Sequence, residues 1–183
     1  MGHGAEGAAE VERGLLLMSH APAQAYIMLA EIYDLLGDEA HHEEVLNEME
    51  AMPGGEKAAG MARASAMIRH GDVAGAERVL RALIDRYPTF PGLWEMLAGA
   101  QASANQNQEA LLSFRRALES ALEWGQGNPA LYLHIAEMLH AMGRDREAFD
   151  QCRLVLALDP RNQTAQALKA ELQNKLAARV PHL

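Results

Sequence analysis

The chain has little of several features that would tie it to a particular class of protein. It has one cysteine in 183 residues, so it cannot form an internal disulfide, and cysteine usage does not fix its redox compartment. Aromatic residues make up only 5% of the chain, whereas alanine, leucine, methionine and glutamate are abundant. Because these residues favour helices and supply little material for β-sandwich strands, we expect an all-α fold.

A basic surface is also missing. The net charge is −9 and no cluster of lysines and arginines occurs, which argues against nucleic acids and anionic membranes as partners. No apolar run approaches the roughly 20 residues of a membrane span, and the N-terminus lacks a basic region followed by an apolar stretch. We therefore expect no membrane span and a cytoplasmic location, with the periplasm as the alternative for a chain that has lost its leader.

The motifs of common catalytic sites are absent too. The sequence has no phosphate-binding loop, no glycine-rich dinucleotide fingerprint and no HExxH motif. Cys152 has no C-x-x-C partner, so a buried core thiol is expected. His134, Met138 and Met142 recur on one helix at a spacing that suits Cu(I), but both methionines occupy places that usually face neighbouring helices. We expect no enzyme activity, no cofactor and no metal site.

What the chain does contain is a recurring pair of short amphipathic helices. Within the stretch 128–162, one helical face carries Tyr132, Ile135, Ala136 and Leu139. Gly143 ends that helix. In the helix that follows, the inward-facing residues are expected to be Ala148, Cys152, Val155 and Leu156. Asp159-Pro160 then ends the second helix, because proline cannot continue one.

Large residues at fixed places, small alanines where two helices approach, and the closing proline resemble the tetratricopeptide repeat (TPR). The resemblance covers residues 23 to 179. It divides the chain into an N-terminal lead and helix (1–22), four repeats (23–56, 57–90, 91–128 and 129–162), and a closing helix with a tail (163–183). It implies an all-α solenoid of helix–turn–helix repeats wound into a right-handed superhelix.

Two details of the repeats lead to specific expectations. Asn105 stands where the other repeats have a turn glycine, and asparagine tolerates the left-handed conformation that this turn demands. The period slips by about four residues, close to one helical turn, before Asn128, so the second helix of the third repeat should be about one turn longer.

The N-terminal segment stays open to two interpretations. Its helix carries Ala8, Val11, Leu15 and Met18 on one face. It is either the second half of an incomplete repeat or an N-terminal capping helix. Glu12 or Arg13 falls where a repeat would have a bulky apolar residue.

In the TPR family the first helices line a concave groove, and the resemblance implies which residues would line it here. They are Gln24, Ile27, Met28, Glu31 and Asp34, then Met61, Ser65, Ile68 and Arg69, then Glu95, Met96 and Ala102, and finally Leu133, His134, Glu137 and His140. Such a groove is part apolar and part acidic.

One TPR subclass holds a peptide's terminal carboxylate with lysine and asparagine, and this chain departs from it. The clamp positions hold Ile27, Glu31, Met61 and Ser65, and Arg69 alone is a weak substitute for the missing cations. A chaperone-tail ligand is therefore not expected.

The predicted function is a protein-interaction scaffold or adaptor whose partner is a protein or peptide, an amphipathic segment with basic flanks. One alternative is a structural TPR module that assembles into a homo-oligomer, for which Trp124 at the inserted turn is the cue. The other alternative is the non-catalytic, substrate-recruiting part of a larger enzyme or assembly complex.

Overall fold

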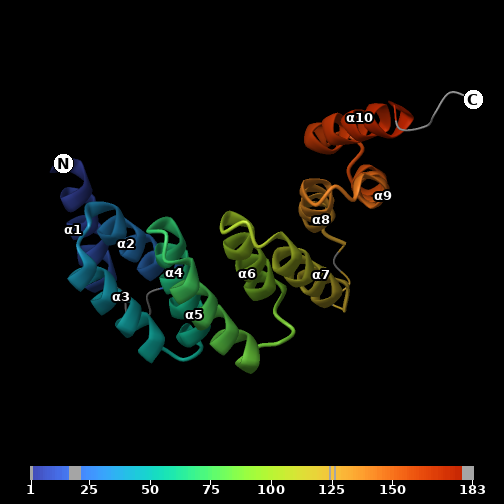
Figure 1. Cartoon of the computed structure of the whole chain (residues 1–183). Helices are drawn as coiled ribbons and strands as arrows, with labels where there is room; N and C mark the ends of the chain where they lie inside the picture. The colour runs from blue at the N-terminus through green and yellow to red at the C-terminus, as the bar shows by residue number, and fades with distance from the viewer. Residues whose placement is uncertain (1, 17–21, 124, 126, 179–183) are drawn as a thin grey trace, which may run out of the picture. The chain divides into compact units, whose positions relative to one another are not determined.

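The computed structural model describes residues 2–16, 22–123, 125 and 127–178. Within these ranges the backbone forms ten α-helices and no strand (Figure 1). The helices are α1 (Gly2–Leu16), α2 (Ala23–Leu36), α3 (Glu39–Ala51), α4 (Gly55–Arg69), α5 (Val73–Arg86), α6 (Pro91–Ser103), α7 (Asn107–Glu123), α8 (Pro129–Ala141), α9 (Asp145–Leu158) and α10 (Gln163–Ala178). The all-α fold predicted from composition is confirmed.

The same turn joins the two helices of four successive pairs, α2–α3, α4–α5, α6–α7 and α8–α9. Each turn has one residue with positive φ, namely Gly37 at 72°, Gly71 at 83°, Asn105 at 59° and Gly143 at 73°. The next residue donates its N–H to a carbonyl five residues back, as Asp38 does to Tyr33 and Gln106 does to Gln101. Asn105 thus adopts the left-handed conformation that its place in the pattern predicted.

The chain divides into two compact units, the first ending at Leu83 and the second beginning at Ile84. In the first unit α1 packs on α2, α2 packs on α3 and α4, and α3 packs on α4 (Figure 1). Its core is formed by Ala8, Leu29, Ala30, Tyr33, Val45, Leu46, Met49 and Ala59.

Gly60 explains how the second repeat manages without a large residue at a core place. A Cβ added to Gly60 would lie 2.7 Å from Cδ1 of Leu83, so the Leu83 side chain already fills that space. The missing bulk on α4 is therefore supplied by α5.

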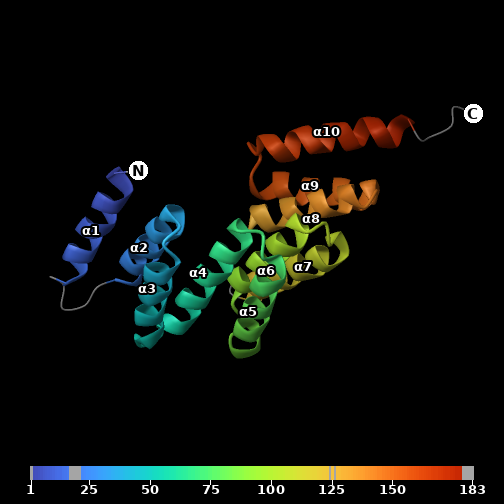
Figure 2. The ribbon, with the colours of Figure 1, turned by 60° about the vertical axis from the view of Figure 1, so that its left-hand side comes forward.

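In the second unit each helix packs on the next, from α6 through α10 (Figure 2). The core includes Phe114, Leu131, Ile135, Leu139, Cys152 and Leu172. Helix α7 has 17 residues, against 14 in α9 and 13 in α3. The repeat boundaries drawn from the sequence stay predictions.

The N-terminal helix packs as its apolar face suggested. Ala8 is buried, and Val11 packs against the core of the first unit. The Leu15 side chain, Met18 and Trp124 lie outside the described residues. Both interpretations of the segment 1–22 therefore stand as predictions.

Ala136 provides a test of the close helix packing. Its exposed fraction is 0%, and it lies in the core of the second unit. Ala136→Leu adds volume that this packing cannot accept, so the free energy of unfolding should fall by about 1 to 3 kcal/mol. Urea unfolding measures the change.

The matched control is Ala141→Leu, at the exposed C-terminal end of the same helix. It should change the free energy of unfolding by less than about 0.5 kcal/mol. Equal effects of the two substitutions would show that α8 does not present Ala136 to the core.

Candidate functional site

The sixteen groove residues implied by the resemblance fall on α2 and α4 in the first unit and on α6 and α8 in the second. None of the sixteen is fully buried. Gln24, Met28, Glu31 and Arg69 are exposed, and the other twelve are partly buried. Because the two units are compact bodies of their own, the two sets are described separately.

The face of α2 and α4 combines exposed apolar surface with charge. Met28 has 49% of its surface exposed, and Leu35, two turns along the same helix, has 82% exposed. Ile27, Met61 and Ile68 are partly buried beside them. Exposed apolar side chains thus lie next to charged ones on these two helices.

Arg69, the cation among the predicted residues of this face, already has partners within the chain. Arg69 donates to Oδ2 of Asp34 from Nε, at 2.8 Å, and to Oγ of Ser65, at 2.9 Å. Nε2 of His70 lies 2.7 Å from the other Asp34 oxygen. Burial works against the charged form of Asp34, but the hydrogen bonds from His70 and Arg69 outweigh it and hold the pKa of this carboxyl below its usual value.

The face of α6 and α8 is organised around His134. Its ring stacks on Phe114 of α7, with ring centroids 5.0 Å apart, and Nδ1 lies 3.3 Å from Oε2 of Glu137. The hydrogen bond with Glu137 raises the pKa of His134 above its usual value, the charge of Glu95 adds to the rise, and burial opposes it. Three of the predicted residues therefore lie close enough to interact.

His140 has a structural role that the sequence did not reveal. Its Nδ1 lies 3.0 Å from Oδ1 of Asp145 at the start of α9, and its Nε2 lies 3.2 Å from Oε1 of Glu171 on α10. Lys175 of α10 donates to the same Asp145 oxygen at 3.0 Å. His140 thus joins α8 to the two helices that follow it.

The residues weighed for chemistry have ordinary core environments. Met138 and Met142 pack against the core of the second unit. Cys152 is fully buried, and burial raises the pKa of its thiol. Across the residues that the structure describes, no group of three or more His, Cys, Asp or Glu side chains is placed to hold a metal ion. No helix within the described ranges is both long and apolar enough to cross a membrane.

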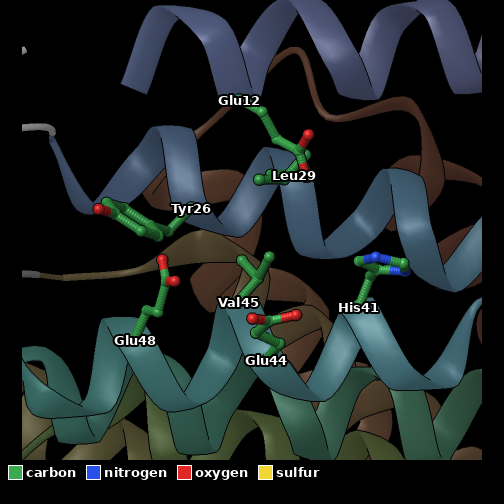
Figure 3. Close-up of a pocket in the computed structure, with 7 residues that line it drawn as sticks. All are labelled: Glu12, Tyr26, Leu29, His41, Glu44, Val45 and Glu48. Atoms are coloured by element: carbon green, nitrogen blue, oxygen red, sulfur yellow. The ribbon is translucent and has the colours of Figure 1, made fainter. Parts of the chain in front are cut away.

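One concave site was missed by the sequence reasoning. A cavity of about 390 Å³ lies among α1, α2 and α3 (Figure 3). Its lining comprises Glu12, Tyr26, Leu29, His41, Glu44, Val45 and Glu48. The available signal was Glu12, a charged residue where a repeat would have a bulky apolar one.

Residues 57–100 match the family model described as the tetratricopeptide repeat. This part of the chain is therefore a tetratricopeptide repeat segment. The match covers all of α5, all but the first two residues of α4, and most of α6. No curated protein matches the chain significantly.

Solved structures of TPR proteins resemble this chain in fold. A thermophilic TPR protein of Thermus thermophilus is 21% identical, with a TM-score of 0.64 over 94% of this chain and 91% of that one. The TPR domain of Arabidopsis OM64 is 18% identical, with a TM-score of 0.58 over 65% of this chain and 95% of that one. The first TPR domain of Spaghetti, bound to an HSP90 peptide, is 18% identical, with a TM-score of 0.59 over 66% of this chain and 93% of that one. At such identities the likeness establishes the fold.

Asp34 gives this chain a pH-dependent contact between α2 and α4. The Asp34 side chain is 7% exposed and the Arg69 side chain 38% exposed, so solvent screens the pair in part. Asp34→Asn should lower the free energy of unfolding at pH 7 by about 1 to 2 kcal/mol. Because the folded pKa is lowered, the stabilisation is present above the unfolded pKa of about 3.9 and is lost as the pH falls through the folded value.

Denaturant unfolding of both proteins at pH 7 and near pH 3 measures this dependence. Glu31→Gln, an exposed carboxylate on the same helix, is the matched control and should be nearly neutral. A difference between Asp34→Asn and the native chain that stays constant down to pH 3 would contradict the ion-pair account.

Proposed function

We propose that this chain is a protein-binding module that holds a segment with apolar anchors and flanking Lys or Arg residues on the open faces of its first helices. The observation that carries the proposal is the balance of charge on α2, α4, α6 and α8. None of α2, α6 and α8 contains a lysine or arginine. Carboxylates on the same faces include Glu31, Glu95 and Glu137.

The cations of α4 do not alter this balance, because they already have partners. Arg63 donates to Glu43, Asn47 and Glu50 of α3. Arg69 is held by Asp34. Lys57 also has a partner within the chain. An incoming carboxylate would have to compete with these contacts, whereas an incoming ammonium or guanidinium would meet acceptors.

The TPR fold supports the same class of function. The Spaghetti domain is bound to the HSP90 peptide SRMEEVD, in which acidic residues outnumber the single basic one. The charge on the first helices of the present chain favours the opposite kind of segment. We therefore infer the same general activity, peptide binding by a TPR array, with a reversed charge preference.

Apolar anchors would supply most of the affinity. Met28 is exposed, and Ile27, Met61, Ile68 and Leu133 are partly buried, so each offers apolar surface at a first-helix face. Methionine adapts its shape to different partners, which suits a recognition surface. Exposed charge pairs contribute modestly, so charge should act mainly on the association rate.

A pair of designed peptides tests the proposal. The first carries leucines at helical spacing with lysines on both flanks, and the second is identical except that glutamates replace the lysines. The lysine peptide should bind more tightly by at least about tenfold, because the glutamate peptide brings like charges together. Biolayer interferometry at low and at physiological salt gives both rate constants.

Variants of the chain assign the binding to the first helices. Changing Glu31, Glu95 and Glu137 to Gln should slow association by about three- to tenfold, while Leu133→Ser should speed dissociation. Glu109→Gln, an exposed carboxylate on the second helix α7, is the matched control. If the two peptides bound alike, or if Glu109→Gln had the same effect as the triple change, the first-helix faces would not be the site.

Self-assembly is the second candidate, and exposed leucines favour it. Leu112 and Leu122 on α7 and Leu154 and Leu158 on α9 have between 45% and 54% of their surface exposed. Sedimentation velocity at increasing concentration distinguishes the candidates, because a self-assembling module would show a rising sedimentation coefficient and a monomeric binder would not.

A further inference from the structure

The cavity among α1, α2 and α3 has the size and lining of a ligand pocket. At about 390 Å³ it falls in the range of small-molecule sites. Tyr26 and Leu29 project into it from α2, and Val45 projects from α3 (Figure 3). Figure 3 shows Glu48 reaching from α3 toward the Tyr26 ring, with Glu12 entering from α1. The pocket therefore combines an apolar and aromatic lining with carboxylates on two sides.

Glu12 occupies a position that is apolar in every other repeat. Counted by the period of about 34 residues, with the slip of about four residues before Asn128, Glu12 corresponds to Leu46, Leu80, Phe114 and Cys152. Those four side chains are 0 to 4% exposed and fill the core. Glu12 instead lines the cavity and places a carboxylate on the pocket wall.

The carboxylates of the pocket are not neutralised by a lysine or arginine within the described ranges. Glu12 accepts a hydrogen bond from the hydroxyl of Tyr33, which is a neutral partner. Glu44 and Glu48 lie one helical turn apart on α3, and neither forms an ion pair with a lysine or arginine in the part of the chain that the structure describes. His41, which also lines the pocket, is paired with Asp38, with 2.7 Å between Nδ1 and Oδ2.

The titration of Tyr33 reflects this negative environment. The hydrogen bond to Glu12, burial, and the charges of Glu12, Asp38 and Glu44 together raise the pKa of Tyr33 to about 12. At neutral pH the phenol of Tyr33 is protonated and donates a hydrogen bond to Glu12. This hydrogen bond holds the Glu12 carboxylate in place.

We propose that this pocket binds a primary alkylammonium group, either the side chain of a partner's lysine or a free diamine. Leu29 and Val45 offer apolar contact for a methylene stem, and the Tyr26 ring offers cation–π contact. Carboxylates from two different helices suit the compact ammonium group, which directs three donors outward, better than the flat guanidinium, which favours one carboxylate in a bidentate pair.

The pocket is separate from the faces of the proposed function. On α2, Tyr26 and Met28 are two residues apart, about 200° around the helix, so they point to opposite sides. A ligand in the pocket contacts α1 and α3, whereas a peptide on the proposed face contacts the exposed side of α2 and α4. The proposal for the pocket and the proposal for the first-helix faces can therefore be tested independently.

The test is a titration of the full chain, followed by amide chemical shifts and by calorimetry. The ligands are N-acetyl-lysine methylamide and cadaverine, with N-acetyl-norleucine methylamide and 1-pentanol as uncharged counterparts and N-acetyl-arginine methylamide as the guanidinium counterpart. The ammonium ligands should shift the amides of Leu29, Glu44 and Val45, and the uncharged ones should not. Binding of cadaverine alone would assign the pocket to free diamines, and binding of the lysine amide would assign it to a partner protein.

Two variants keep the test independent of folding. Glu44 and Glu48 are exposed, so changing both to Gln should preserve the helix, as circular dichroism can verify, and should weaken ammonium binding by about five- to tenfold. Glu109→Gln, an exposed carboxylate on α7 that lies outside both the pocket and the first-helix faces, should leave it unchanged. The proposal is overturned if norleucine and lysine amides bind alike, if the arginine amide binds more tightly than the lysine amide, or if the double variant binds as well as the native chain.

Discussion

Close contact between the two helices of each pair is the constraint on which this structure depends. A column of alanines makes it achievable, because Ala30, Ala64, Ala98 and Ala136 have at most 1% of their surface exposed. The second helices contribute Ala76, Ala110 and Ala148 at the matching place, each fully buried. Small side chains let the two helix backbones approach, so larger residues on either side can interlock and fill the core at crystal-like density.

One repeat departs from this rule and shows how a polar group is accommodated. His42 stands where the later second helices have alanine, and it is buried. Its Nδ1 lies 2.9 Å from the carbonyl oxygen of Ala30, the alanine of the facing helix. A buried imidazole would be costly without such a partner, so the hydrogen bond replaces the contact that two alanines make elsewhere.

Periodicity predicted the core well, because the same physical demands recur at about 34-residue intervals. The left-handed turn at Asn105 and the burial of Ala136 follow from local chemistry and helix geometry alone. Partnerships between side chains on different helices did not follow in the same way. Asp34 and Arg69 were both expected on one face, but their pairing depends on how α2 is set against α4.

The candidate site was predicted less completely for the same reason. His140 was placed on the groove by its position in the repeat, yet Asp145 and Glu171 engage its ring from the two following helices. Glu12 was recognisable as a misfit, whereas the cavity beside it depends on the spacing between α1 and α3. Sequence position says which face of a helix a residue occupies, and packing decides which neighbour its polar atoms meet.

The central claim is that a partner binds to the first helices, where carboxylates and apolar residues coincide, and paramagnetic relaxation tests it most directly. A basic amphipathic peptide carrying a nitroxide label would be added to the isotopically labelled chain, and the loss of amide signals would be mapped. The account predicts that signals are lost at exposed positions of the first helices in at least one unit, around Glu31 and Met28 or around Leu133 and Glu137. Signal loss confined to the second helices α3, α7 and α9 would contradict it.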